Sequence, residues 1–362
     1  MLRVSEFVRM AIEGRSYEPP EGITLIWNLT NRCNLSCQHC YASAGSDPKV
    51  ELSLSEIRRI ADELVCEGVR FAVLSGGEPL LRDDIFSLSG ILTEKGIRTY
   101  LSTNGLLINR DNVSLISESF DYVGISIDGT PSVHDAFRGR RWAFKNSFRA
   151  LELCLSEGIK TGIRFTLTEF TAGSLPFIFD LAKDLSVDRL YISHLVFSGR
   201  GMRLSRPERV ALRNISSFIM DMALDMTEEG SRTAVITGNS EMDAVILLER
   251  FGRRYGECED NLREILRRWG GNSAGERLLC IDHRGDVKPD PFFFHSLGNL
   301  RTQSFGEVWN SGGILSELRR RPRRIKGRCS NCPYLEICNG GSRARAFAVY
   351  GDYLAEDPGC YL

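Results

Sequence analysis

From residue 23 to residue 197, short runs of apolar and β-branched residues alternate with longer amphipathic segments. Repeated strand–helix units of this kind predict a parallel sheet covered by helices. About six units fall short of the eight that close a complete barrel. We therefore expect an α/β fold, a partial (β/α)6 TIM-like barrel, although an open doubly wound sheet has the same periodicity. The predicted strands are Ile23–Leu29, Val69–Leu74, Ile97–Ser102, Tyr122–Ile127, Lys160–Leu167 and Arg189–Phe197.

The amphipathic segments between these strands predict helices on the outside of the sheet. The first has a serine-rich capping signal that starts at Ser53, and it ends before Gly68. The predicted helices are Ser53–Glu67, Ile85–Lys95, Val113–Ser119, Phe144–Glu157 and Leu175–Leu185.

After Gly199 the pattern changes, which indicates a second domain. It predicts three helices, a glycine-rich break and a hairpin, in the order Pro207–Glu228, Ser240–Tyr255, Asn261–Trp269, 270–275, Arg277–Ile281 and Asp286–Lys288. We expect an N-terminal helical extension over residues 1–20, the barrel over 21–230 and a C-terminal domain over 231–362.

The bulk composition is that of an ordinary water-soluble protein, with 42% hydrophobic and 26% charged residues. No apolar run approaches the roughly 18–20 residues that cross a bilayer. The start of the chain is amphipathic and charged, unlike a secretory signal. The net charge of −1 gives no general attraction to nucleic acid. We therefore expect a cytoplasmic protein with neither a membrane nor a nucleic-acid partner.

Three cysteines, Cys33, Cys37 and Cys40, follow the first predicted strand in the spacing Cys-x3-Cys-x2-Cys. Thiolates are soft ligands that favour iron–sulfur clusters, zinc or copper(I). Full ligation of a 4Fe–4S cluster usually takes four cysteines, so three would leave one iron open for a reactive ligand. On spacing alone, a zinc site built from the Cys37/Cys40 half-site and a disulfide both remain alternatives.

Polar or glycine-rich groups end each of the following strands, where barrel enzymes place their functional residues. Gly76 and Gly77 permit close backbone approach, and Glu78 offers a carboxylate. Asp128 suits ribose hydroxyls, and Arg164 could clamp a carboxylate. Taken singly, each signal is typical of a turn or a surface ion pair. Their recurrence at one end of successive strands is what indicates a site.

In order along the chain, these motifs resemble those of the radical S-adenosylmethionine (SAM) superfamily. The matching stretches are 33–41, 76–79, 102–105 and 125–129. The resemblance implies that the three cysteines hold a 4Fe–4S cluster whose open iron chelates SAM, which is cleaved to a 5′-deoxyadenosyl radical. It further implies that SAM is bound by Gly76, Gly77 and Glu78 at its amino group, Ser126 and Asp128 at its ribose, Arg164 at its carboxylate, and also by Ser102 and Asn104.

A second cysteine set resembles the auxiliary-cluster regions called SPASM or twitch domains. It consists of Cys329, Cys332, Cys338 and Cys360, which by this resemblance would hold a second 4Fe–4S cluster. A zinc knuckle is the alternative. SPASM domains carry Gly-x4-Cys in the preceding hairpin, whereas Asp290 stands at that position here, so we expect one auxiliary cluster. The remaining thiols are expected to be buried and structural: Cys66, Cys154, Cys258 and Cys280.

Three further stretches, 194–201, 270–290 and 338–346, resemble the haem-biosynthesis branch of the superfamily. In that branch AhbC-type enzymes remove acetate side chains from 12,18-didecarboxysirohaem to give Fe-coproporphyrin, and NirJ-type enzymes remove propionate side chains in haem d1 biosynthesis. The resemblance implies a sirohaem-derived tetrapyrrole substrate and an external low-potential electron donor, ferredoxin- or flavodoxin-like. We expect acetate removal, with propionate removal and SPASM-type peptide or sulfatase modification as alternatives.

A flat, multiply carboxylated macrocycle needs fixed cations and aromatic surface. Candidate contacts are Arg343, Arg345 and Phe292–Phe294. His194, His283 or His295 could contact its iron or a carboxylate, but a structural histidine is the favoured interpretation for each of them. The basic run Arg319–Arg328 could guide an anionic tetrapyrrole or form a solvated surface.

Overall fold

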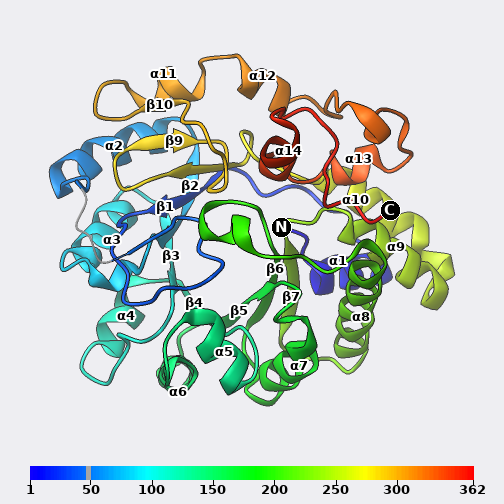
Figure 1. Cartoon of the computed structure of the whole chain (residues 1–362), viewed down its shortest axis with the longest axis horizontal. Helices are drawn as coiled ribbons and strands as arrows, with labels where there is room; N and C mark the ends of the chain where they lie inside the picture. Colours follow the sequence, from blue (N-terminus) through cyan, green and yellow to red (C-terminus); the bar gives the residue numbers. More distant parts are fainter. Residues whose placement is uncertain (46–49) are drawn as a thin grey trace.

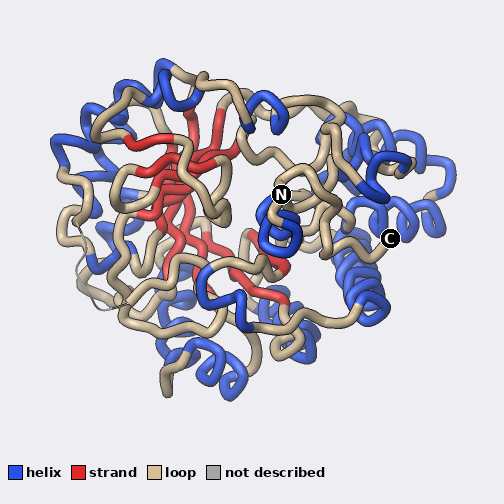
Figure 2. The backbone as a smooth tube through the Cα atoms, turned by 45° about the horizontal axis from the view of Figure 1, so that its top comes forward, coloured by secondary structure: helices blue, strands red, loops and turns tan. Residues whose placement is uncertain are grey.

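The computed structural model describes residues 1–45 and 50–362, and its strands form one continuous band (Figure 2). The six strands of the predicted barrel are all present, each within a few residues of its expected bounds. The strands are β1 (Ile23–Asn28), β2 (Val69–Ser75), β3 (Arg98–Thr103), β4 (Tyr122–Ser126), β5 (Thr161–Leu167), β6 (Arg189–His194), β7 (Ala234–Gly238), β8 (Leu278–Ile281), β9 (Asp286–Lys288) and β10 (Gly298–Asn299).

Helices α2 to α7 surround the outer side of the curved sheet (Figure 1). Ser53 caps α2 in a complete capping box with Glu56, as the sequence signal predicts. The helices are α1 (Val4–Ile12), α2 (Leu54–Cys66), α3 (Ile85–Glu94), α4 (Val113–Ser119), α5 (Pro131–Arg138), α6 (Ala143–Ser156), α7 (Leu175–Asp184), α8 (Arg209–Glu228), α9 (Asp243–Arg254), α10 (Glu259–Trp269), α11 (Phe305–Trp309), α12 (Ile314–Leu318), α13 (Leu335–Cys338) and α14 (Arg343–Tyr350).

The sheet has the strand order β10-β9-β8-β1-β2-β3-β4-β5-β6-β7. Neighbours from β1 to β7 are parallel, and β8 is parallel to β1, whereas β9 and β10 continue antiparallel. The carboxyl ends of the parallel strands therefore meet at one edge, as in other β/α barrels. The α/β partial barrel that the periodicity predicts is confirmed.

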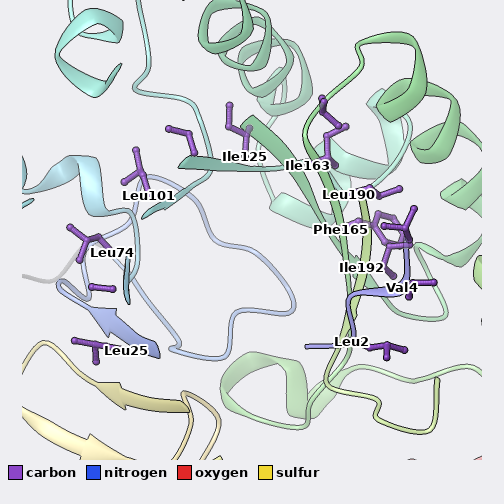
Figure 3. Close-up of a cluster of buried hydrophobic side chains, with 14 of the residues drawn as sticks. Leu2, Val4, Leu25, Leu74, Leu101, Ile125, Ile163, Phe165, Leu190 and Ile192 are labelled. Atoms are coloured by element: carbon purple, nitrogen blue, oxygen red, sulfur yellow. The ribbon is translucent and has the colours of Figure 1, made fainter. Parts of the chain in front are cut away.

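The main core lies between the sheet and its helices. Because side chains alternate along a strand, every second residue of β1 to β6 enters this layer and the others face the inside of the curve. Figure 3 shows the layer, which continues to Leu2 and Val4 at the start of the chain. The strand residues labelled there are Leu25, Leu74, Leu101, Ile125, Ile163, Phe165, Leu190 and Ile192.

Strand β7 was not predicted, because its five residues lie between two helix patterns. It extends the sheet beyond β6, and its outer edge is covered by the start of the chain: Leu2 and Thr237 exchange two backbone hydrogen bonds of 2.8 and 2.9 Å. Helix α1 packs against β7, α8 and α10. Pairing with Leu2 removes part of an exposed strand edge that could otherwise pair with another chain.

The C-terminal segment is joined to the barrel by strand pairing. β8 pairs with β1 from Thr24 to Trp27, and the segment then runs past α11 and α12 to α13 across one side of the molecule (Figure 1). Strands from before and after residue 230 thus belong to one sheet. The domain boundary expected near that residue stays a prediction. No helix among the described residues is long and apolar enough to cross a membrane.

Replacing Leu190 by alanine tests the core layer. Leu190 is fully buried on β6, so Leu190→Ala is expected to lower the free energy of unfolding by about 2–5 kcal/mol through lost burial and a cavity. Urea unfolding under anaerobic conditions measures the change. Leu115→Ala is the matched control, since Leu115 is 43% exposed and should cost no more than about 0.5 kcal/mol. Equal losses for the two variants would contradict this packing.

Candidate functional site

The loop that carries Cys33, Cys37 and Cys40 lies across the end of β2. Gly77 N donates to Thr30 O at 2.7 Å, and Glu78 N donates to Arg32 O at 2.8 Å. A β-carbon on Gly77 would lie 2.1 Å from Arg32 O, so no larger residue fits. The glycine pair therefore serves first to let the cysteine loop approach the sheet.

Each sulfur of this loop accepts a hydrogen bond from an N–H donor. The pairs are Leu35 N to Cys33 Sγ at 3.4 Å, Ala44 N to Cys40 Sγ at 3.4 Å, and Arg138 Nη1 to Cys37 Sγ at 3.7 Å. Hydrogen bonds of this kind to cysteine sulfurs tune iron–sulfur clusters. The donor set, three thiols with N–H partners on one loop, fits the cluster that the sequence predicts.

The sulfurs need positive charge to act as thiolates. Burial raises the pKa of Cys33 to about 12 and also raises the pKa of Cys37, while the nearby Arg138 guanidinium opposes the shift at Cys37. Iron bound by the thiolates would supply the further positive charge that offsets their burial.

The loop after β6 closes over the cysteine loop from the other side. Arg200 donates to Cys37 O at 2.8 Å and to Ala44 O at 2.7 Å. Gly199 has φ +54°, and a β-carbon there would lie 2.3 Å from Tyr41 O. The stretch 199–201 thus has a structural role at the first site. The sequence pointed to this stretch only through family resemblance.

Glu78 is fully buried and connects the ends of β2 and β3. Its Oε1 accepts from Thr103 Oγ1 at 2.7 Å and Leu80 N at 3.2 Å, and its Oε2 accepts from Asn104 N at 2.8 Å. Burial raises its pKa to about 7 although these hydrogen bonds oppose the shift. Both oxygens already have partners within the protein, so the arrangement favours a positioning role.

Asp128 is likewise enclosed. Arg138 holds its Oδ2 at 2.5 Å, and Thr166 N donates to its Oδ1 at 2.7 Å, while Asp128 N donates to His134 Nδ1 at 3.0 Å. Its expected contact with ribose stays a prediction. Arg138, which contacts both Asp128 and Cys37, was missed because α5 was not among the predicted helices.

Ser102, Ser126 and Arg164 remain available to a ligand. Ser126 is paired in register with Arg164 across β4 and β5, and the Arg164 guanidinium stacks 4.8 Å from the centre of the Tyr191 ring. None of these three side chains has a hydrogen-bond or ion-pair partner among the described residues. Asn104, in contrast, donates to Asn34 Oδ1 at 2.7 Å and so steadies the cysteine loop.

The second cysteine set is brought together from three segments. Cys329 and Cys332 lie in and just after the short 3-10 turn 327–331, Cys338 ends α13, and Cys360 lies in the C-terminal tail. Burial, with a smaller contribution from the neighbouring thiols of the set, raises the pKa of Cys329 and raises that of Cys338 to about 12. Gly340 N donates to Cys338 Sγ at 3.4 Å.

Zinc and a 4Fe–4S cluster require different spacings between the cysteine sulfurs. Among residues 1–45 and 50–362, no three His, Cys, Asp or Glu side chains are placed to surround one metal ion. Zinc holds its thiolates at about 2.3 Å, whereas the cysteines of a 4Fe–4S cluster bind different irons and stand further apart.

The tail that carries Cys360 is fixed by a buried polar network. The Tyr361 hydroxyl donates to Asp243 Oδ1, which also accepts from Ser216 Oγ at 3.1 Å, and His194 Nε2 lies 3.0 Å from Asp243 Oδ2. His194 is therefore engaged with Asp243, as expected for a structural histidine. The network joins the end of β6, α8 and α9 to the second cysteine set.

The arginines expected to bind substrate carboxylates are structural. Arg343 is fully buried and donates to the carbonyls of Gly340, Tyr353 and Ala355, and Arg345 forms a buried ion pair with Asp357 at 2.7 Å. The expectation for these two residues is wrong, because the sequence shows their charge but not their burial.

The basic run 319–328 is also largely paired within the protein. Arg323 is buried and donates to Leu318 O and Ala274 O, and burial lowers its pKa to about 9. Other members form ion pairs: Arg320 with Glu317, Arg321 with Glu276, Lys326 with Asp352 and Arg328 with Glu356. Arg323 is therefore structural, whereas most of the run is exposed, in line with the solvated surface that was one of the expectations.

Asp290, which stands where SPASM domains carry a cysteine, is buried and closes a turn. Its Oδ1 accepts from Phe292 N at 2.8 Å and Phe293 N at 3.1 Å, and burial raises its pKa to about 6. Cys154 and Cys280 are buried as expected. Cys66 is exposed, contrary to expectation, because it is the last residue of α2 and faces outward.

Sequence profiles of two known families match parts of the chain that include the first cysteine set and the first two cysteines of the second set. The profile of the Radical SAM superfamily matches residues 27–182, and that of the SPASM iron–sulfur cluster-binding domain matches residues 273–333.

Similar proteins cover almost the whole chain. "Pre-heme d1 synthase" of Dinoroseobacter shibae is 40% identical, and "Fe-coproporphyrin III synthase" of Methanosarcina barkeri is 37% identical. Each alignment spans 93% of this chain, and 86% and 87% of the respective relative. Among solved structures, Streptococcus suis SuiB bound to S-adenosylmethionine has a TM-score of 0.73 at 19% identity, over 94% of this chain and 77% of that one. That similarity concerns the fold.

Substituting Gly77 tests the contact between the cysteine loop and the sheet. Gly77→Ala is expected to push the loop away and to remove most of the iron of the first site, about four of the eight irons of two 4Fe–4S clusters. Iron and sulfide analysis after anaerobic reconstitution measures this. Gly90→Ala is the control, because a β-carbon there meets no atom within 4 Å. Full iron content in Gly77→Ala would contradict the proposed contact.

Removing the Tyr361 hydroxyl tests the anchoring of Cys360. Tyr361→Phe leaves the buried Asp243 carboxylate short of a donor, at a cost of about 1–3 kcal/mol. We expect a lower Tm and loss of iron from the second site only. Tyr350→Phe is the control, since Tyr350 is 51% exposed. Unchanged Tm and iron content in Tyr361→Phe would show that the network does not hold the tail.

Proposed function

The chain belongs to the radical SAM superfamily, in its haem-biosynthesis branch, and we propose that it removes acetate side chains from a sirohaem-derived tetrapyrrole. The proposed substrate is 12,18-didecarboxysirohaem and the product Fe-coproporphyrin. Cys33, Cys37 and Cys40 would hold a 4Fe–4S cluster, which would supply the reductive cleavage of bound SAM. The protein must bind and orient SAM and substrate and exclude water.

We assign the SAM contacts according to which groups are available. Ser126 and Arg164, whose polar atoms have no partner within the described chain, would bind the ribose and the carboxylate. The backbone of Gly76 and Gly77 would face the amino group. Glu78 and Asp128 would act indirectly, by fixing the strand ends that carry these groups.

The observation that carries the choice of a tetrapyrrole is an aromatic platform beside the cysteine loop. We define it as Phe293, Phe294, His295, Phe347 and Tyr353. Tyr353 stacks on both Phe293 and Phe347, with ring centres 4.4 and 4.3 Å apart, and Phe294 lies 5.6 Å from Phe347. Part of it faces solvent, because Phe294 and His295 are exposed. A flat macrocycle can stack on such a surface.

The platform is connected to the first site by a single aromatic contact. Phe292, directly before the platform, meets Tyr41 edge to face at 5.1 Å, and Tyr41 directly follows Cys40. Tyr41 in turn donates to Asn28 Oδ1 at 2.8 Å. The platform is thus linked through Phe292 to the loop that carries the three cysteines. His295, bonded to the Tyr353 hydroxyl at 3.0 Å, is the histidine best placed to reach its iron or a carboxylate.

A second candidate is removal of propionate side chains in haem d1 biosynthesis. The specific observation in its favour is the 40% identity to a protein named pre-heme d1 synthase, against 37% to one named Fe-coproporphyrin III synthase. The structural similarity to SuiB is compatible with peptide modification as a third candidate, at the level of the fold.

Product masses separate these candidates. Reconstituted protein is incubated anaerobically with SAM, dithionite and 12,18-didecarboxysirohaem, and the expected product has lost two acetate side chains. Cys37→Ala, which removes one ligand of the first cluster, is the control and should give no product. Loss of two propionates would favour the second candidate. No macrocycle-dependent change, with both clusters in place, would refute both.

A further inference from the structure

His295 is the one exposed histidine among the five of the chain, all of which lie in its described part. It is part of the turn between β9 and β10 and directly follows Phe294 of the aromatic platform. The buried or half-buried histidines are His39, His134, His194 and His283. His295 is therefore the histidine that a bound molecule can reach directly.

Three contacts orient the imidazole of His295. Its Nδ1 lies 3.0 Å from Tyr353 Oη. Its ring is perpendicular to that of Phe347, at 90° and 4.9 Å between ring centres, and nearly perpendicular to that of Tyr353, at 84° and 6.1 Å. With Nδ1 as the donor to the Tyr353 oxygen, the lone pair of the neutral ring is on Nε2. Metal-bound histidines have this arrangement, in which the second nitrogen is hydrogen-bonded to the protein.

The angle between His295 and the platform suits axial coordination of iron. Phe293, Tyr353 and Phe347 form a stack, in which the Tyr353 ring is inclined by 13° to Phe293 and by 20° to Phe347. A macrocycle that stacks on these rings lies parallel to them, and so at about a right angle to the imidazole. An axial imidazole has the same relation to its macrocycle, because the Fe–N bond lies in the imidazole plane and along the normal of the macrocycle.

Iron suits His295 better than a substrate carboxylate does. A carboxylate accepts hydrogen bonds, and the one N–H of the neutral imidazole is already used by Tyr353. What remains is the Nε2 lone pair, which has no hydrogen-bond partner among the described residues. Imidazole nitrogen is a common ligand of iron.

We propose that His295 is the axial ligand of the iron in the tetrapyrrole substrate, and that Tyr353 is a positioning residue that orients its imidazole. The proposal rests on the proposed function, which supplies a macrocycle that contains iron. Nε2 donates its lone pair to the iron and takes the place of an axial water, and neither an electron nor a proton is transferred. The iron is thereby fixed beside the platform.

Binding without turnover tests the axial ligand. Protein with both clusters reconstituted and oxidised is titrated anaerobically with ferric 12,18-didecarboxysirohaem, without SAM or reductant. Absorbance measures the affinity, and electron paramagnetic resonance detects nitrogen ligation of the ferric iron. His295→Ala and Tyr353→Phe are compared with the wild type, and Glu152→Ala, at an exposed position on α6, is the control. The iron-free macrocycle with the same side chains is titrated in parallel.

We expect His295→Ala to bind the iron macrocycle about tenfold or more weakly and to lose the nitrogen-ligated signal, which added imidazole should restore. Tyr353→Phe keeps its ring in the stack, so it should retain nitrogen ligation but bind the iron macrocycle severalfold more weakly. Because stacking does not need the iron, both variants should bind the iron-free macrocycle within twofold of the wild type. Glu152→Ala should behave as the wild type with both macrocycles.

An unchanged signal and affinity in His295→Ala would overturn the axial ligand. Equal losses with the iron and the iron-free macrocycle would also overturn it, since His295 would then contact a side chain or only support the platform. Wild-type affinity of Tyr353→Phe for the iron macrocycle would refute the positioning role alone. If the wild type binds neither macrocycle, the proposed function itself fails, so the two failures are distinguishable.

Discussion

The backbone contact between the cysteine loop and the end of β2 is the constraint on which the first site depends. Gly77 and Glu78 donate to Thr30 and Arg32, and the loop then receives Arg200 from the far side and Asn104 from β3. Three strand ends therefore determine where the three sulfurs lie. Without the glycine pair, the loop could not come close enough for any of the later contacts to form.

Two buried carboxylates, Glu78 and Asp128, also hold neighbouring strand ends together. An isolated buried charge is unfavourable, so a carboxylate that remains inside must be hydrogen-bonded or paired. Glu78 meets this requirement with donors from β3 and its own turn, and Asp128 with Arg138 and Thr166. These residues join neighbouring strands and leave the free polar groups, Ser126 and Arg164, to face the inside of the curve.

Local patterns along the chain were enough to predict the six barrel strands and the Ser53 cap. They were not enough for β7, whose five residues have no clear period, or for Arg138, which lies on a short helix outside the pattern. They were misleading for Arg343, Arg345 and Arg323, since a charged residue is expected to be exposed unless its buried partners are known. Those partners, such as Asp357 and the carbonyls around Gly340, come from segments that only folding brings together.

The continuity of the sheet limits how the molecule can be divided. β8 covers the outer edge of β1, and β7 covers that of β6, although both strands come from beyond residue 230. A fragment that ends at that residue would leave unpaired backbone groups along the outer edges of β1 and β6. Such exposed strand edges favour aggregation. A chimera that exchanges one half of the chain must therefore also match these two strand pairings.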